Sequence, residues 1–218
     1  MLQAIQAAVK KKVHIISMSW TIDPPENDEG VELDKAIAEA KSRDILMFCA
    51  ASDRGAKQIA TYPSKAAPNK IFTIGAASAW GAADPRVGDL SDITLTFPGD
   101  KVDQPGSGDG AAKEVSGSSV ATAVGAGLAA LVLYCVQVAI LLASDPDQEK
   151  LRVAFTKLRK HDVMLQAIKD IGTSEKSNHK FVEVWRLFSK KTEEREKTGQ
   201  DRWIELVADV GRTVCSRL

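Results

Sequence analysis

The 218-residue sequence has little cysteine, and this shortage excludes some classes of protein. Its three cysteines, Cys49, Cys135 and Cys215, are an odd number at scattered positions, which is unlike a disulfide framework or a thiolate metal site. Cys49 and Cys135 lie in apolar runs, where a thiol behaves as a small core side chain. Reduced cysteines are typical of an intracellular protein. We therefore expect an intracellular location for the chain as it stands, with no metal and no cofactor.

The sequence also lacks net charge, repeats and a signal peptide. Its 29 basic and 29 acidic side chains cancel, so neither a nucleic acid nor a membrane surface is expected as a partner. Residues 1–12 have the period of an amphipathic helix instead of the uninterrupted apolar core of a signal sequence. The chain is therefore expected to begin inside a domain.

Apolar runs alternate with helical patterns along the first part of the chain. Val13–Trp20 and Asp44–Ala51 are apolar and rich in β-branched residues, as in buried parallel strands. Val31–Ser42 between them has a helical period, and two further strands are expected at Lys70–Ala76 and Ile93–Gly99. The inner face of that helix is expected to contain Leu33, Ile37 and Ala40. This order predicts an α/β fold, with a parallel sheet flanked by helices.

A longer apolar stretch, Glu114–Tyr134, opens with the small-residue turn Ser116–Ser119. An all-apolar helix is either a core helix or a membrane span. The turn favours a core helix, because serine at a helix start caps free backbone N–H groups. A membrane span over Val120–Ala143 is the weaker alternative, since aromatic belts are missing. The same helix start also suits a nucleophile, because free N–H groups and the helix dipole favour an oxyanion.

Within this stretch, Gly117–Thr122 reads Gly-Ser-Ser-Val-Ala-Thr and resembles the Gly-Thr-Ser-Met-Ala-Thr nucleophile motif of the subtilisin-like serine peptidases. Val13–Ser19 is similar to the family strand that ends in Asn-Met-Ser-Leu-Gly, and Ile45–Gly55 to the strand that ends in Ala-Ala-Gly-Asn-Glu-Gly. Tyr62-Pro63 and Ile71–Ala76 also match family segments. The resemblance runs from Met1 to about Tyr134 and implies a partial subtilisin-like fold, the C-terminal half of a catalytic domain.

The resemblance implies a role for several residues. Ser119 corresponds to the nucleophile, and its own N–H to one oxyanion donor. Asp53 stands at the oxyanion-hole position of the family, where an Asn donates a hydrogen bond that an ionised Asp cannot give. The walls of the pocket for the residue before the scissile bond would be formed by Ser19, Trp20 and Thr21 and by Ala50, Ala51 and Ser52.

Two triad members are missing, because the family's Asp and His motifs precede the region that is matched here. His14 lies inside a strand and is expected to be structural, whereas His161 and His179 are expected to be solvated. A serine without a base is a weak nucleophile, so we expect the chain alone to be inactive.

The sequence changes character at residue 145. Charged amphipathic patterns follow at Glu149–Arg159, Val163–Ile171, Phe181–Ser189 and Arg202–Arg217. We predict two parts: residues 1–144, the C-terminal half of a peptidase domain, and residues 145–218, a helical extension.

The predicted function is that of a serine endopeptidase acting on a peptide or protein substrate, present here as a fragment. The alternative is a non-catalytic module of the same fold that binds a protein partner through its C-terminal helices. An exposed sheet edge at Val13–Ser19 would also favour self-association.

Overall fold

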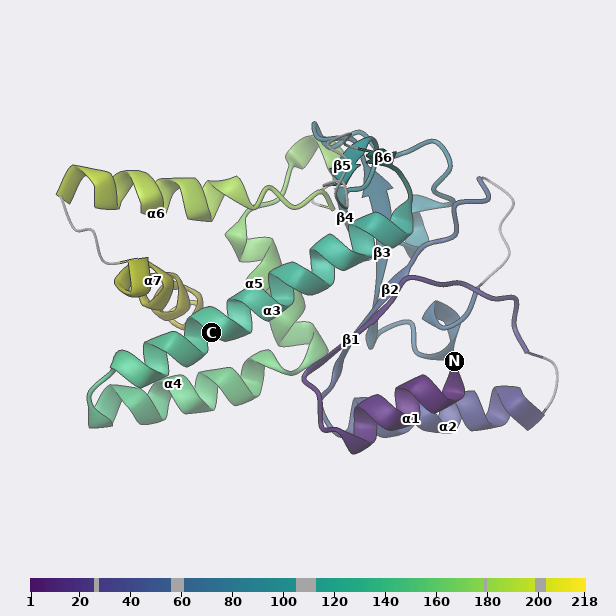
Figure 1. Ribbon diagram of the computed structural model, residues 1–218, viewed down its shortest axis with the longest axis horizontal. Helices are drawn as coiled ribbons and strands as arrows, with labels where there is room; N and C mark the ends of the chain where they lie inside the picture. The colour runs from purple at the N-terminus through teal and green to yellow at the C-terminus, as the bar shows by residue number, and fades with distance from the viewer. Residues whose placement is uncertain (26–27, 56–60, 105–112, 179, 199–202) are drawn as a thin grey trace.

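The computed structural model describes residues 1–25, 28–55, 61–104, 113–178, 180–198 and 203–218 (Figure 1). Its centre is a four-stranded sheet in the order β1-β2-β3-β4. The strands are β1 (Ile15–Met18), β2 (Leu46–Ala50), β3 (Ile71–Ala77) and β4 (Leu95–Pro98). All three pairings are parallel, which confirms the predicted α/β architecture.

Helices cover both faces of the sheet, and alternate side chains of each strand enter different cores. On one face, Met47 and Cys49 pack with α1 (Leu2–Lys10) and α2 (Asp28–Ser42). On the other face, Phe48 and Phe72 pack in one cluster with α3 (Ser118–Leu142). The inner face predicted for α2 is confirmed, since its buried side chains include Leu33, Ile37 and Ala40.

The apolar helix α3 is the longest element, with 25 residues. Its mean hydropathy of 2.3 would suit a membrane span, but 56% of the apolar window is buried within the chain, as in a core helix. It packs against the sheet, α4 (Asp145–Leu158) and α7 (Trp203–Cys215). A Cβ on Gly211 of α7 would lie 2.3 Å from the carbonyl oxygen of Cys135, so the two helices touch backbone to backbone.

The helical extension also contains α5 (His161–Ile171) and α6 (Trp185–Thr198). The helix predicted at Phe181–Ser189 begins only at Trp185. Before it, the chain is extended, and the N–H of Thr96 donates to the carbonyl of Lys180 at 2.9 Å. Leu158 and Met164 of the extension belong to the same core cluster as the sheet. The boundary at residues 144 and 145 stays a prediction.

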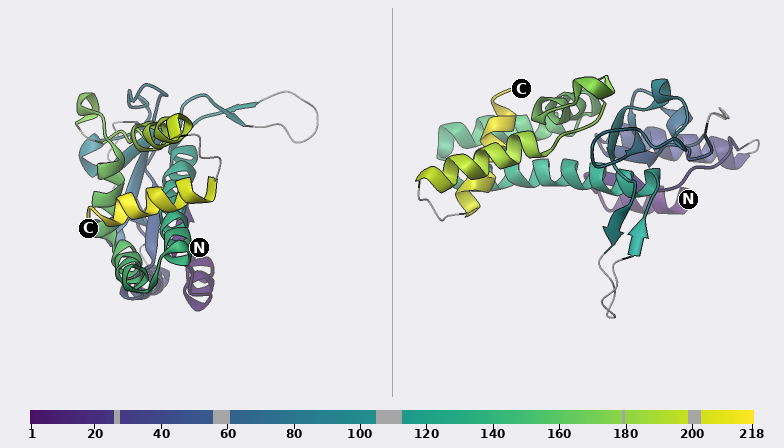
Figure 2. Two further views of the ribbon diagram at one scale, coloured as in Figure 1. Left: turned by 90° about the vertical axis from the view of Figure 1, so that its left-hand side faces the viewer. Right: turned by 90° about the horizontal axis from the view of Figure 1, so that it is seen from above.

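A small two-stranded ribbon precedes the turn at the start of α3. It consists of β5 (Val102–Gln104) paired antiparallel with β6 (Lys113–Val115), and Figure 2 shows it projecting from the body. Residues 105–112, between the two strands in the sequence, lie outside the described residues.

His161 corrects a second expectation, because it is packed and not solvated. Its ring lies 4.1 Å from that of Phe72, centroid to centroid, and its Nε2 is buried without a hydrogen-bond partner among the described residues. Burial, with a smaller effect of Lys70, lowers the pKa of His161 to about 4. His14 packs edge-on against Phe155, as a structural histidine would. His179 lies outside the described residues.

Candidate active site

The candidate site begins at the turn before α3. Gly117 has φ 141°, a conformation that side chains with a Cβ rarely adopt. Its N–H donates to the carbonyl of Gly99 at 2.7 Å, just after β4. A Cβ on Gly117 would lie 3.0 Å from Oδ2 of Asp53, which follows β2. The turn therefore brings α3 to the carboxyl edge of the sheet, where sites form in parallel α/β folds.

Ser118 is fully buried and makes several hydrogen bonds. Its N–H donates to Oδ2 of Asp53 at 2.8 Å, and its hydroxyl donates to Oδ1 of Asp53 at 2.6 Å. The same hydroxyl oxygen accepts from the N–H of Ala76 at 3.1 Å. The carbonyl of Ser118 accepts from the hydroxyl of Thr122 at 2.7 Å. Ser118 is thus a fixed structural residue. The expected serine cap is wrong, because the N-cap of α3 is Gly117, which has no side chain to cap the helix.

Ser119, the next residue, is exposed. Among the described residues, neither its hydroxyl nor its backbone N–H has a hydrogen-bond partner, while its carbonyl accepts from Oγ of Ser19 at 3.2 Å. A hydroxyl and an N–H, both free among the described residues, therefore lie together at the positive end of a long apolar helix. This arrangement suits nucleophilic attack with stabilisation of the resulting oxyanion.

Asp53 lies beside this turn, as the resemblance implied, but its side chain is exposed and bonded to Ser118. The turn that carries Asp53 is held by a neighbouring loop, because the N–H of Gly55 donates to the carbonyl of Arg86 at 2.8 Å. Arg86 also donates from Nε to the buried Asp84 at 3.0 Å, and these hydrogen bonds lower the pKa of Asp84. Sequence reasoning missed Arg86 and Asp84, which belong to no motif.

Two residues of one predicted pocket wall line a cavity close to the end of β2. Ala51 and Ser52 line a cavity of about 490 Å³, with Thr61 and Ser64 among the other lining residues. Ala50 is buried at the end of β2. His161 of the extension lines the same cavity.

The residues of the other predicted wall are not among those that line this cavity. Ser19 is exposed, and Trp20 and Thr21 are half-buried. Ile22, which follows them, exchanges backbone hydrogen bonds with Tyr62 at 3.1 and 2.9 Å. The segment is therefore anchored on the α1 and α2 side of the sheet, where Trp20 packs against the core.

Comparisons with known structures identify the fold. The prenylagaramide maturation protease PagA matches with a TM-score of 0.60 at 19% identity, over 85% of this chain and 65% of that one. The self-cleaved protease domain of PatA matches with a TM-score of 0.59 at 21% identity, over 86% of this chain and 65% of that one. A lanthipeptide protease matches with a TM-score of 0.58 at 16% identity, over 85% of this chain and 64% of that one. The chain spans a little under two thirds of the length of these structures, and the matches extend into the helical extension.

A search of curated proteins found no match. The family model for the subtilase family, in contrast, matches residues 1–139, well over half of the chain. It ends near the end of α3, so the matched region includes the whole sheet, the Gly117–Ser119 turn and all but the last three residues of the helix. The chain belongs to the subtilase family.

Proposed function

We propose that this chain is the C-terminal part of the catalytic domain of a subtilisin-like serine endopeptidase, with Ser119 as its nucleophile. The observation that carries the proposal is the free Ser119 hydroxyl beside its free N–H at the start of α3. In the reaction, Oγ of Ser119 attacks a peptide carbonyl and the oxyanion faces the N–H of Ser119. Loss of the amine leaves an acyl-enzyme, which water then hydrolyses.

The described residues supply no base for this reaction. Within the described part of the chain, the two histidines are engaged elsewhere, His14 with Phe155 and His161 with Phe72. The nearby carboxylate of Asp53 bonds Ser118 and not the nucleophile. The chain alone is therefore inactive, and a further polypeptide segment supplies the Asp and His of the triad.

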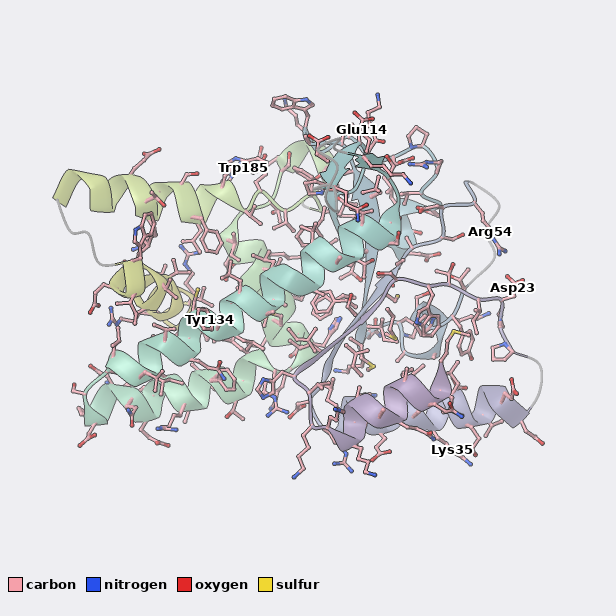
Figure 3. All side chains as sticks on the ribbon, in the orientation of Figure 1. Asp23, Lys35, Arg54, Glu114, Tyr134 and Trp185 are labelled. Atoms are coloured by element: carbon pink, nitrogen blue, oxygen red, sulfur yellow. The ribbon has the colours of Figure 1, made fainter. Side chains whose placement is uncertain are left out.

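The open side of the molecule provides a place for that segment. β1 is an edge strand, and it ends next to Ser19, which is bonded to the Ser119 carbonyl. The outward face of α3 is apolar: Val124, Leu131 and Tyr134 are 38%, 40% and 56% exposed. Figure 3 marks Tyr134 on this helix. A strand added beside β1 would carry its following residues towards Ser119, while a helix covers α3. Without that segment, the same surface favours self-association.

The test is hydrolysis of a peptide by the chain co-expressed with a segment that carries the Asp and His motifs of a subtilase. We expect activity only when both parts are present, and we expect Ser119→Ala to abolish it. Ser189→Ala is the control, because Ser189 is an exposed serine of α6, away from this turn, and its loss should leave most activity intact. Full activity in Ser119→Ala would refute the assignment.

A second candidate function is partner binding through the C-terminal helices without catalysis. Trp203 and Ile204 at the start of α7 favour it, since they are 70% and 52% exposed. Large exposed apolar side chains that lie together mark interaction surfaces. This candidate predicts that Trp203→Ala weakens binding of a captured protein partner and that Ser119→Ala does not.

A further inference from the structure

We propose that Asp53 is a positioning residue that clamps the first turn of α3, and not a donor in the oxyanion hole. The proposal rests on the proposed function in one respect, namely that Ser119 is the nucleophile whose N–H is being positioned. It assigns Asp53 a task different from that of the Asn in the resembling motif.

The geometry is that of a two-point clamp. Both carboxylate oxygens of Asp53 accept from one residue, Oδ2 from the N–H of Ser118 at 2.8 Å and Oδ1 from its hydroxyl at 2.6 Å. Ala76 in β3 holds the same hydroxyl at 3.1 Å, and Gly99 after β4 holds the N–H of Gly117. The turn is thus tied to residues of β3 and to residues that follow β2 and β4.

The absence of a side chain at Gly117 makes the clamp sterically feasible. A Cβ there would lie 3.0 Å from Oδ2 of Asp53, which is closer than most real contacts of a Cβ. The φ of Gly117 also lies in the region that favours glycine. Gly117 therefore serves both the turn and the approach of the carboxylate.

The clamp acts on Ser119 through one peptide group. The peptide plane between Ser118 and Ser119 carries the free N–H of Ser119 at one end and the carbonyl of Ser118 at the other. The hydroxyl of Thr122 holds that carbonyl at 2.7 Å, while Asp53 holds the N–H and side chain of Ser118. A preorganised donor of this kind stabilises an oxyanion because it need not reorient during the reaction.

The chemistry of the carboxylate also excludes the donor role in this arrangement. With both oxygens acting as acceptors, Asp53 presents no N–H or O–H to an oxyanion. An Asn at this position keeps one acceptor for the Ser118 N–H, and its amide group then faces the Ser118 hydroxyl. Asp53→Asn should therefore weaken the clamp without adding an oxyanion donor.

The first experiment needs no catalysis and uses the full chain. Equilibrium unfolding is measured for Asp53→Ala, Ser118→Ala and the double variant. We expect each single variant to lower the unfolding midpoint, and the second substitution to add little to the first, because both remove the same bonds. Fully additive losses would overturn the clamp. Asp23→Ala, which removes another exposed aspartate near this turn, is the control.

The second experiment uses the complemented peptidase and separates kcat from KM. We expect Asp53→Ala to lower kcat at least tenfold with KM nearly unchanged, and Asp53→Asn to restore part of the loss without exceeding the wild type. A kcat for Asp53→Asn above that of the wild type at neutral pH would overturn the proposal, because it would show a donor facing the oxyanion. If no variant or wild type has activity, the proposed function fails and the unfolding cycle alone decides the clamp.

Discussion

The two faces of α3 have similar composition but different surroundings. One face is covered by the sheet and by α7, so that Ala121, Ala129 and Val132 are fully buried. The other face is nearly as apolar, yet Tyr134 is 56% exposed. Gly125 on the covered face would place a Cβ 2.9 Å from Phe97, whereas Gly127 on the open face has nothing within 4 Å. The comparison shows that the open face of α3 is as apolar as the covered face and more exposed, which supports the proposal that a further polypeptide covers it.

The largest expected effect concerns the covered side. Gly211→Val should destabilise the chain by about 3 kcal/mol or prevent folding, because a Cβ there meets the backbone of α3, which cannot rotate away. Thermal and urea unfolding of the purified variant measure the change. A stability within about 0.5 kcal/mol of the wild type would show that α3 and α7 do not touch.

His161, which packs against Phe72, should make the stability of the folded chain depend on pH. Its pKa is about 4 in the folded chain against an ordinary 6.5, so as the pH falls the unfolded chain takes up the proton first. The free energy of unfolding is therefore not reduced by this group above about pH 6.5. It falls progressively between pH 6.5 and pH 4, by roughly 1–3 kcal/mol. Urea unfolding between these pH values measures it. His161→Phe should flatten the profile, and an unchanged slope in that variant would refute the assignment.

On the open side, Leu131→Glu should leave the unfolding free energy within about 0.5 kcal/mol of the wild type. It should nevertheless lower the peptidase activity of the chain combined with the Asp- and His-bearing segment at least tenfold. The reason is that it places a charge on the outward face of α3, where we propose that this segment docks. Leu128→Glu, a buried neighbour on the covered face, should unfold the chain. Val153→Glu on α4 is the matched control, since Val153 is 49% exposed and lies outside the proposed docking face. Equal activity in Leu131→Glu and Val153→Glu would contradict docking on α3.

The smallest expected effect is a gain in stability. Gly127→Ala should stabilise the isolated chain by up to about 1 kcal/mol, because alanine favours a helix and meets no neighbour at this position. The gain appears as a higher unfolding midpoint. A loss of stability would mean that a part of the chain already covers this face.

Sequence patterns predicted the strands and the start of α3, because buried strands and the small-residue turn before an apolar helix have local signatures; the expected serine cap was wrong, since Gly117 is the N-cap. They could not predict the bonding of Asp53 to Ser118, which joins residues 65 positions apart through the exact course of the turn. His161 was misjudged because its helix is amphipathic, and only the contact with Phe72 decides its burial. Phe181 looked helical locally, but its segment pairs with Thr96.

The most direct test of the account is covalent labelling of Ser119 by a fluorophosphonate, located by peptide mass spectrometry. The reagent reacts with an activated serine. We expect the peptide that contains Ser119 to be labelled when the chain is complemented with a segment carrying Asp and His, and to remain unlabelled in the chain alone and in Ser119→Ala. Hydrolysis of peptide by the complemented protein without any label on Ser119 would contradict the account.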